Sequence, residues 1–196
     1  MADHHADGGY APRVRALETM LEERGVVTGA ELDTILDGLL ANATPLNGAR
    51  IISRAWVDDG FRQRLLDDAN TAATELGLRL GYGPKPVLLR VAANTATVHN
   101  MVVCTLCSCY PIALLGPSPS WYKSVEYRSR AVRWPRAVLA EFGLDLDPDV
   151  EIRVWDASAE TRYLVLPRRP AGTDGYAEDR LASLVTRNGM IGTAAV

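Results

Sequence analysis

The chain has little of several features that mark specialised classes of protein. Its 196 residues include three cysteines, too few for the disulfide framework of a small secreted domain. Neither sign of charge dominates: 21 Lys and Arg residues face 24 Asp and Glu residues, and the net charge of −3 gives no general attraction to nucleic acid or anionic membranes. No apolar run approaches the roughly 18–20 residues of a membrane span, and residues 1–9 lack the basic and apolar segments of a signal peptide. We therefore expect a cytoplasmic protein with no nucleic-acid or membrane partner.

What is present is an ordinary globular composition, 47% hydrophobic and 23% charged. The first 80 residues have the apolar spacing of helices. They predict one helix from Pro12 towards Gly25 and further helices over 28–40, 47–56 and 58–76. Thr28 and Glu31 have the spacing of a capping box at the start of the second helix.

The pattern changes after residue 80, where the apolar runs become short and rich in valine. We predict strands over 87–91, 98–103, 151–155 and 161–166, and helices over 124–142 and 176–186. The last two strands are separated by Asp156–Glu160, a spacing typical of a β-hairpin. This mixture of elements indicates an α+β fold.

The three cysteines, Cys104, Cys107 and Cys109, lie within six positions and directly follow a predicted strand. The spacer between Cys107 and Cys109 is too short for an ordinary tetrahedral metal knuckle. If both sulfurs bind one ion, the backbone nitrogens of Ser108 and Cys109 are held against it in five- and six-membered chelate rings. Three sulfurs and two deprotonated amide nitrogens occupy five positions of an octahedron and leave the sixth open, which is typical of a catalytic metal site.

The donor set also constrains the metal. Thiolates and anionic amides are strong-field donors, which favour low-spin trivalent iron or cobalt over zinc. Spacing alone leaves a second interpretation open, a structural zinc site in which His99 joins the three cysteines. His99 lies at a strand position, where a buried and hydrogen-bonded histidine is more common than a ligand.

Val103–Tyr110, with the sequence VCTLCSCY, resembles the metal-binding loop of the nitrile hydratase α subunit in its cobalt form. The resemblance covers roughly 100 to 120 residues and is highly specific. It continues through Trp121–Ser124, Glu126–Arg128, Pro135–Arg136, Val138–Gly143, Glu151–Asp156, Arg162–Tyr163, Pro167, Thr186 and Met190–Gly192. Toyocamycin nitrile hydratase and the thiocyanate hydrolase γ subunit are similar relatives. The family pattern makes the zinc interpretation much weaker.

The resemblance implies a role for each loop position. Cys104 would be the axial thiolate, Cys107 the sulfinate and Cys109 the sulfenate, with the amide nitrogens of Ser108 and Cys109 completing the set. Thr105 and Tyr110 match the cobalt form, so the expected cofactor is Co³⁺, with iron the weaker alternative. Cys107 and Cys109 would be the catalytic residues. Either the Cys109 sulfenate oxygen or an activated water could attack the nitrile carbon.

The family also implies an organisation and partners. Residues 1–80 would form a helical arm that contacts a β-type subunit, and residues 81–196 an α-β-β-α layered domain that carries the metal. Because both oxidised sulfurs are anionic, they require charged donors, which in this family are arginines of the β-type subunit. An activator protein that delivers the metal is a further expected partner.

The expected reaction is hydration of a small-molecule nitrile to its amide. Asp156, Glu160 and Arg162 match family positions near the site. Most cobalt relatives have Trp-Pro where this chain has Ile112-Ala113, so we predict a larger pocket and a bulky substrate, such as the nucleoside nitrile toyocamycin. Lys85 stands where some relatives have a glutamine near the substrate channel.

Two other functions remain as alternatives. One is the metal-bearing subunit of a thiocyanate hydrolase, which requires a basic residue near the pocket because its substrate is an anion. The other is a non-catalytic cobalt-binding or redox-sensing subunit whose cysteines are oxidised as a signal.

Overall fold

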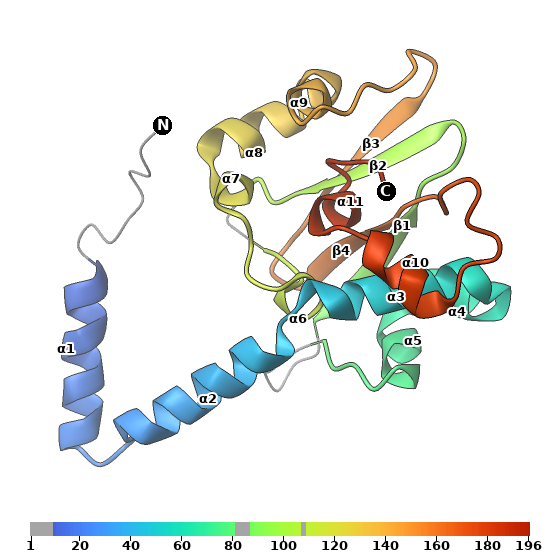
Figure 1. Cartoon of the computed structure of the whole chain (residues 1–196). Helices are drawn as coiled ribbons and strands as arrows, with labels where there is room; N and C mark the ends of the chain where they lie inside the picture. Colours follow the sequence, from blue (N-terminus) through green and yellow to red (C-terminus); the bar gives the residue numbers. More distant parts are fainter. Residues whose placement is uncertain (1–9, 81–86, 107–108) are drawn as a thin grey trace. The chain divides into compact units, whose positions relative to one another are not determined.

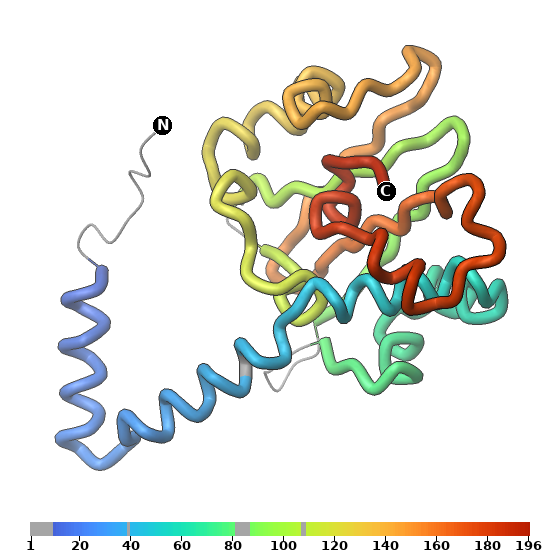
Figure 2. The backbone as a smooth tube through the Cα atoms, in the orientation of Figure 1, coloured from blue at the N-terminus to red at the C-terminus, as the bar shows by residue number. Residues whose placement is uncertain are grey.

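The computed structural model describes residues 10–80, 87–106 and 109–196 (Figures 1 and 2). The chain divides into two compact units, the first ending at Asn42 and the second comprising Ala43–Val196. None of the described helices has the length and apolar character needed to cross a membrane.

The part of the first unit that the structure describes forms two helices, α1 (Tyr10–Glu23) and α2 (Gly29–Asn42). The predicted capping box at the start of α2 is confirmed. The Thr28 N–H donates to the Glu31 carboxylate at 2.8 Å, and the Glu31 N–H donates to the Thr28 hydroxyl at 3.2 Å. The Thr28 hydroxyl, which donates to the Glu31 carboxylate at 2.9 Å, and the Thr28 N–H lower the pKa of Glu31. The apolar side chains of α1, among them Val14 and Leu17, are exposed.

The second unit begins with three helices, α3 (Pro45–Val57), α4 (Asp59–Asp67) and α5 (Ala69–Glu75). The prediction of one continuous helix over 58–76 is wrong, because Asp68 ends α4 and caps α5. Its carboxylate accepts hydrogen bonds from the Thr71 N–H at 3.1 Å and from the Thr71 hydroxyl at 2.6 Å. Helices α3, α4 and α5 pack within the second compact unit. The predicted organisation into a helical arm over 1–80 and a metal-carrying domain over 81–196 stays a prediction.

The described residues of the second unit form four strands, β1 (Leu88–Ala93), β2 (Val98–Val103), β3 (Glu151–Asp156) and β4 (Thr161–Leu166). The predicted hairpin between β3 and β4 is wrong. In the described part of the chain, β1 pairs with β4 and β2 with β3, both parallel, in two separate two-stranded sheets.

Two backbone hydrogen bonds show why the hairpin does not form. The Ala157 N–H donates to the Val103 carbonyl at 2.7 Å, so the chain after β3 continues alongside β2 instead of turning back. The Glu160 carbonyl then accepts from the Leu88 N–H at 2.8 Å, which brings the start of β4 to β1. The short connection therefore carries the chain from one sheet to the other.

Helices cover both sheets and produce the expected α-β-β-α layers (Figure 1). Helices α4 and α5 contact β1, β4 contacts β2, and β3 contacts α9 (Pro135–Glu141). The remaining helices are α6 (Ile112–Leu115), α7 (Ser120–Lys123), α8 (Val125–Ala131), α10 (Glu178–Leu184) and α11 (Arg187–Ile191).

The helix predicted over 124–142 is divided into α8 and α9. The Ser124 hydroxyl caps α8 by accepting from the Tyr127 N–H at 3.1 Å. Pro135 then occupies the first turn of α9, where its missing N–H costs no hydrogen bond, whereas a continuous helix would place it in the interior.

Candidate metal centre

The cysteine segment begins where β2 ends. Cys104 follows Val103 directly and is fully buried, and Cys109 is also buried. Cys107 and Ser108, the other two predicted ligand residues, lie outside the described residues. Leu106, which lies between the buried Cys104 and Cys109 in the chain, is 85% exposed. The segment therefore passes from the core to the surface and returns.

The first anchor of this segment is Asp156, at the end of β3. In the parallel register Asp156 lies opposite Val103, the last residue of β2. Its carboxylate accepts from the Thr105 N–H at 2.9 Å and from the Thr105 hydroxyl. Asp156 thus holds the first residue after Cys104, consistent with the predicted position of this carboxylate near the site.

Two buried tyrosines contact the main chain around this segment: Tyr122 of α7 forms its second anchor, and Tyr127 of α8 contacts β2 before the segment begins. The Tyr122 hydroxyl donates to the Cys109 carbonyl at 3.0 Å, and the Tyr127 hydroxyl donates to the Val102 carbonyl at 2.6 Å. Burial raises the pKa of both phenols, so both remain protonated donors. The sequence predicted no role for either side chain, because no local pattern links a tyrosine to a carbonyl many residues away.

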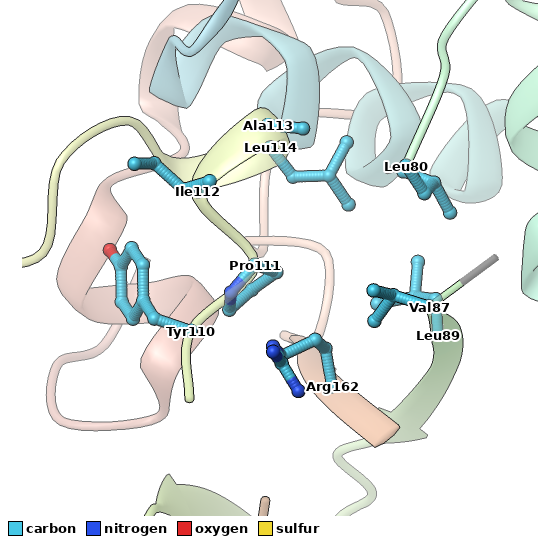
Figure 3. Close-up of a pocket in the computed structure, with 9 residues that line it drawn as sticks. All are labelled: Leu80, Val87, Leu89, Tyr110, Pro111, Ile112, Ala113, Leu114 and Arg162. Atoms are coloured by element: carbon cyan, nitrogen blue, oxygen red, sulfur yellow. The ribbon is translucent and has the colours of Figure 1, made fainter. Parts of the chain in front are cut away.

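An apolar cavity of about 130 Å³ is lined by Tyr110, the residue that follows Cys109 in the chain (Figure 3). One side is formed by Tyr110 and Pro111 and by the first residues of α6, including Ile112 and Ala113. The other side is formed by Leu80, Val87, Leu89 and Arg162. The residues that replace the usual Trp-Pro pair therefore line this cavity.

The position of Arg162 is set by its own turn. Its guanidinium donates to the carbonyls of Ser158 and Ala159, in the connection between β3 and β4. Among the described residues that line the cavity, Arg162 has the one charged side chain. Glu160, by contrast, is exposed and accepts from the Ser158 hydroxyl at 3.0 Å, and Lys85 lies outside the described residues.

His99 does not join the cysteines in the described structure. Its Nε2 is 2.8 Å from the Gly192 carbonyl, and its Nδ1 is 3.3 Å from the Asn94 amide nitrogen. Because the carbonyl can only accept, Nε2 carries the proton and Nδ1 accepts from Asn94. Both ring nitrogens are therefore engaged, and the residues described contain no group of three His, Cys, Asp or Glu side chains placed to hold a metal.

The donor chemistry fits a thiolate-bound metal. Cys104 and Cys109 are buried, and the main chain carrying them is held on one side by Asp156 and on the other by Tyr122. Soft sulfur donors on a restrained segment suit a transition metal, and a site beside a cavity leaves room for a small ligand.

Comparison with known proteins identifies the family of the chain. The profile of the family described as "Nitrile hydratase, alpha chain" matches residues 9–194. The chain belongs to the nitrile hydratase α-chain family. Enzymes of this family are hydro-lyases, which add water to a nitrile to form an amide.

The cobalt-containing relative supports the metal type, and the solved structure supports the fold. The chain is 53% identical to the low-molecular weight cobalt-containing nitrile hydratase subunit alpha of Rhodococcus rhodochrous, over 94% of this chain and 87% of that protein. It is 43% identical to the thiocyanate hydrolase subunit gamma of Thiobacillus thioparus, over 91% of this chain and 76% of that protein. A double histidine-to-alanine variant of the Fe-type nitrile hydratase from Comamonas testosteroni Ni1 matches with a TM-score of 0.88 and 39% identity, covering 99% of this chain and 92% of that one. The α+β fold predicted for a nitrile hydratase α chain is confirmed.

Proposed function

We propose that this chain is the metal-bearing α subunit of a cobalt nitrile hydratase and hydrates a nitrile to its amide together with a β-type subunit. The observation that carries the proposal is the burial of Cys104, directly after β2, and of Cys109, whose chain neighbour Tyr110 lines the cavity together with Ile112. Family membership and the cobalt-containing relatives support it.

The proposed ligands are the sulfurs of Cys104, Cys107 and Cys109 and the amide nitrogens of Ser108 and Cys109. Bound there, a trivalent cobalt ion would supply Lewis acidity that makes the nitrile carbon electrophilic. Oxidation of Cys107 to sulfinate and of Cys109 to sulfenate remains part of the proposal. Asp156 and Tyr122 hold the main chain at Thr105 and Cys109, which would restrict the positions of the ligands at both ends of the segment.

The residues of the chain would position the substrate and exclude water. The nitrile substituent enters the cavity, where Tyr110, Pro111 and Ile112 provide an apolar wall. The overall reaction adds one water to the triple bond: the oxygen joins carbon and the protons finish on nitrogen. The attacking oxygen comes from a Cys109 sulfenate or directly from water.

A β-type partner is supported by what this chain leaves exposed. Leu106 is 85% exposed although it lies between buried cysteines, and a covering subunit would remove its apolar side chain from water. The exposed apolar side chains of α1 and α2 include Val14, Leu17, Ile35 and Leu36. We propose that both surfaces contact the partner, whose arginines would pair with the oxidised sulfurs. An activator protein and a cytoplasmic location remain predictions.

The finer substrate proposal is a bulky nitrile. Ile112 and Ala113 occupy less volume than the Trp-Pro pair of most cobalt relatives, which leaves space beside Tyr110. The apolar lining fits an aromatic or branched substituent better than the hydroxylated ribose of a nucleoside nitrile such as toyocamycin. A nucleoside would also extend beyond a cavity of about 130 Å³ and would require surface from the partner.

Arg162 favours a second candidate, the metal-bearing subunit of a thiocyanate hydrolase. Its guanidinium lies at the cavity, where a positive charge would attract an anion. The carbonyls of Ser158, Ala159 and Thr161 already accept hydrogen bonds from this guanidinium, so it offers a diffuse charge rather than a dedicated anion clamp. We therefore place thiocyanate second.

One experiment separates these functions. The chain is coexpressed with its β-type subunit in cobalt-supplemented cells, and the purified complex is examined by metal analysis, peptide mass and product assays. We expect cobalt, the mass of a sulfinate at Cys107 and a sulfenate at Cys109, and amide production. Carbonyl sulfide and ammonia from thiocyanate would support the second candidate. Cobalt and oxidised cysteines without turnover would support a redox-sensing subunit, and tetrahedral zinc would contradict all three.

A further inference from the structure

The Tyr122 hydroxyl reaches the main chain of one proposed ligand residue. It donates to the Cys109 carbonyl at 3.0 Å, and the whole side chain is buried. We infer that Tyr122 is a positioning residue for the metal centre, which holds the backbone at Cys109 and so determines where its sulfur and amide nitrogen lie. This inference rests on the proposed function.

The surroundings of Tyr122 leave its ring little freedom. Its centroid lies 5.0 Å from that of Tyr110, 6.0 Å from Trp121 and 5.8 Å from Tyr127. These contacts fix the direction of the hydroxyl. They come from Tyr110, directly after Cys109, and from Trp121 and Tyr127 in α7 and α8. A close-packed ring therefore transmits the rigidity of the core to the Cys109 carbonyl.

Tyr127 provides a contrast within the same aromatic cluster. Because the Val103 carbonyl faces β3, where it accepts from the Ala157 N–H, the neighbouring Val102 carbonyl points to the opposite edge of β2. The Tyr127 hydroxyl satisfies that buried carbonyl at 2.6 Å. Tyr127 thus completes a strand edge, whereas Tyr122 acts on a residue proposed to bind the metal.

The consequence for the metal is specific to Tyr122. Cys109 would contribute two donor atoms, and the carbonyl held by Tyr122 belongs to the same residue. Without the hydroxyl, the Cys109 carbonyl loses this hydrogen bond and the local backbone relaxes. Such a shift changes the positions of both donors and therefore the ligand field, even if the fold survives.

The test compares three phenylalanine variants of the coexpressed complex. Tyr122→Phe removes the proposed positioning contact, and Tyr127→Phe removes an equally buried hydroxyl from the strand edge. Tyr163→Phe serves as a control, because no hydrogen bond of its hydroxyl occurs among the described residues. The measurements are the visible thiolate-to-cobalt absorption per bound cobalt, kcat and KM per bound cobalt, and the thermal midpoint.

We expect Tyr122→Phe to shift the absorption band and to lower kcat about fivefold to tenfold with little change in KM, as loss of one positioning hydrogen bond predicts. Tyr127→Phe should lower the thermal midpoint while the absorption and kcat per cobalt stay at the wild-type values. Equal effects of both substitutions on the absorption, or an unchanged band and kcat in Tyr122→Phe, would overturn the inference.

A second variant keeps the test decisive if Tyr122→Phe does not fold. Replacing Tyr122 with 3-fluorotyrosine retains the ring and makes the phenol a stronger donor, so the band should move in the opposite direction; an unmoved band would contradict the positioning role. If the wild-type complex itself binds no cobalt, the proposed function fails. If the wild type binds cobalt and the variants match it, only the role of Tyr122 fails.

Discussion

The Asp156 carboxylate holds Thr105 by two hydrogen bonds, one from its N–H at 2.9 Å and one from its hydroxyl. The two residues lie fifty-one positions apart in the chain. They meet because β3 runs parallel to β2 in a register that places Asp156 opposite Val103. The end of β3 therefore holds the start of the cysteine segment.

We expect Asp156→Asn to weaken this anchor, because an amide has one acceptor oxygen where the carboxylate has two. The thermal midpoint of the complex should fall by about 2–4 °C, and the fraction of cobalt-loaded complex should fall at limiting cobalt. Thermal unfolding and metal analysis measure these effects. Thr105→Val removes the hydroxyl and retains the N–H. In the double variant with Asp156→Asn, the fall in thermal midpoint should be smaller than the sum of the falls in the two single variants. Fully additive losses would show that the two side chains act independently.

Ile112→Trp should narrow the cavity beside Tyr110. The indole would occupy space that the isoleucine leaves open, so KM for benzonitrile should rise about tenfold or more, whereas acetonitrile should be affected little. Steady-state kinetics with both nitriles measures the change in preference. Ile112→Leu, which conserves the volume, is the matched control. An unchanged ratio between the two nitriles in Ile112→Trp would exclude this cavity as the substrate pocket.

His99 should make the fold sensitive to acid. Burial lowers the pKa of His99 below its ordinary value of 6.5, although the hydrogen bond to Gly192 opposes this shift. The unfolded chain therefore binds a proton more readily than the folded chain, so the contribution is complete above pH 6.5 and is lost as the pH falls below it. Urea unfolding midpoints across this range should fall more steeply for the wild type than for His99→Gln. Parallel curves for the two proteins would contradict the assignment.

Gly192→Ala should be strongly destabilising. Gly192 has a φ of +88°, and an added Cβ would lie 2.0 Å from the Asn100 carbonyl oxygen. Because both the backbone conformation and the close approach to β2 oppose a side chain, we expect a loss of at least about 3 kcal/mol in the free energy of unfolding. Gly175→Ala, where no atom lies within 4 Å of the added Cβ, is the control. Chemical denaturation of both variants measures the difference.

Strand positions could be predicted from the sequence, but strand pairing could not. The predicted ranges 98–103 and 161–166 coincide with β2 and β4. Alternation and β-branching are local properties, so they identify extended segments. They contain no information on the partner of each strand, and the short connection after β3 suggested a hairpin where the structure has two parallel pairings.

The helix breaks were present in the sequence but were ambiguous there. Asp68 and Pro135 both lie within long runs of helical periodicity, and each has an alternative place in a continuous helix or at a new start. Packing decided between them. Helices α4 and α5 both contact β1, and α9 contacts β3. Continuous straight helices over 58–76 and 124–142 would not allow these contacts.

By itself, the sequence determined the chemistry available to this protein, since the spacing of the cysteines constrains which donor atoms can reach one ion through local stereochemistry alone. It also determined the family, through motifs that extend far beyond the cysteine segment. Only the tertiary structure decided that the Tyr122 hydroxyl reaches the Cys109 carbonyl, that Asp156 binds Thr105, and that Arg162 lines the cavity. Their contacts join residues far apart in the chain, and such contacts depend on how the whole core packs.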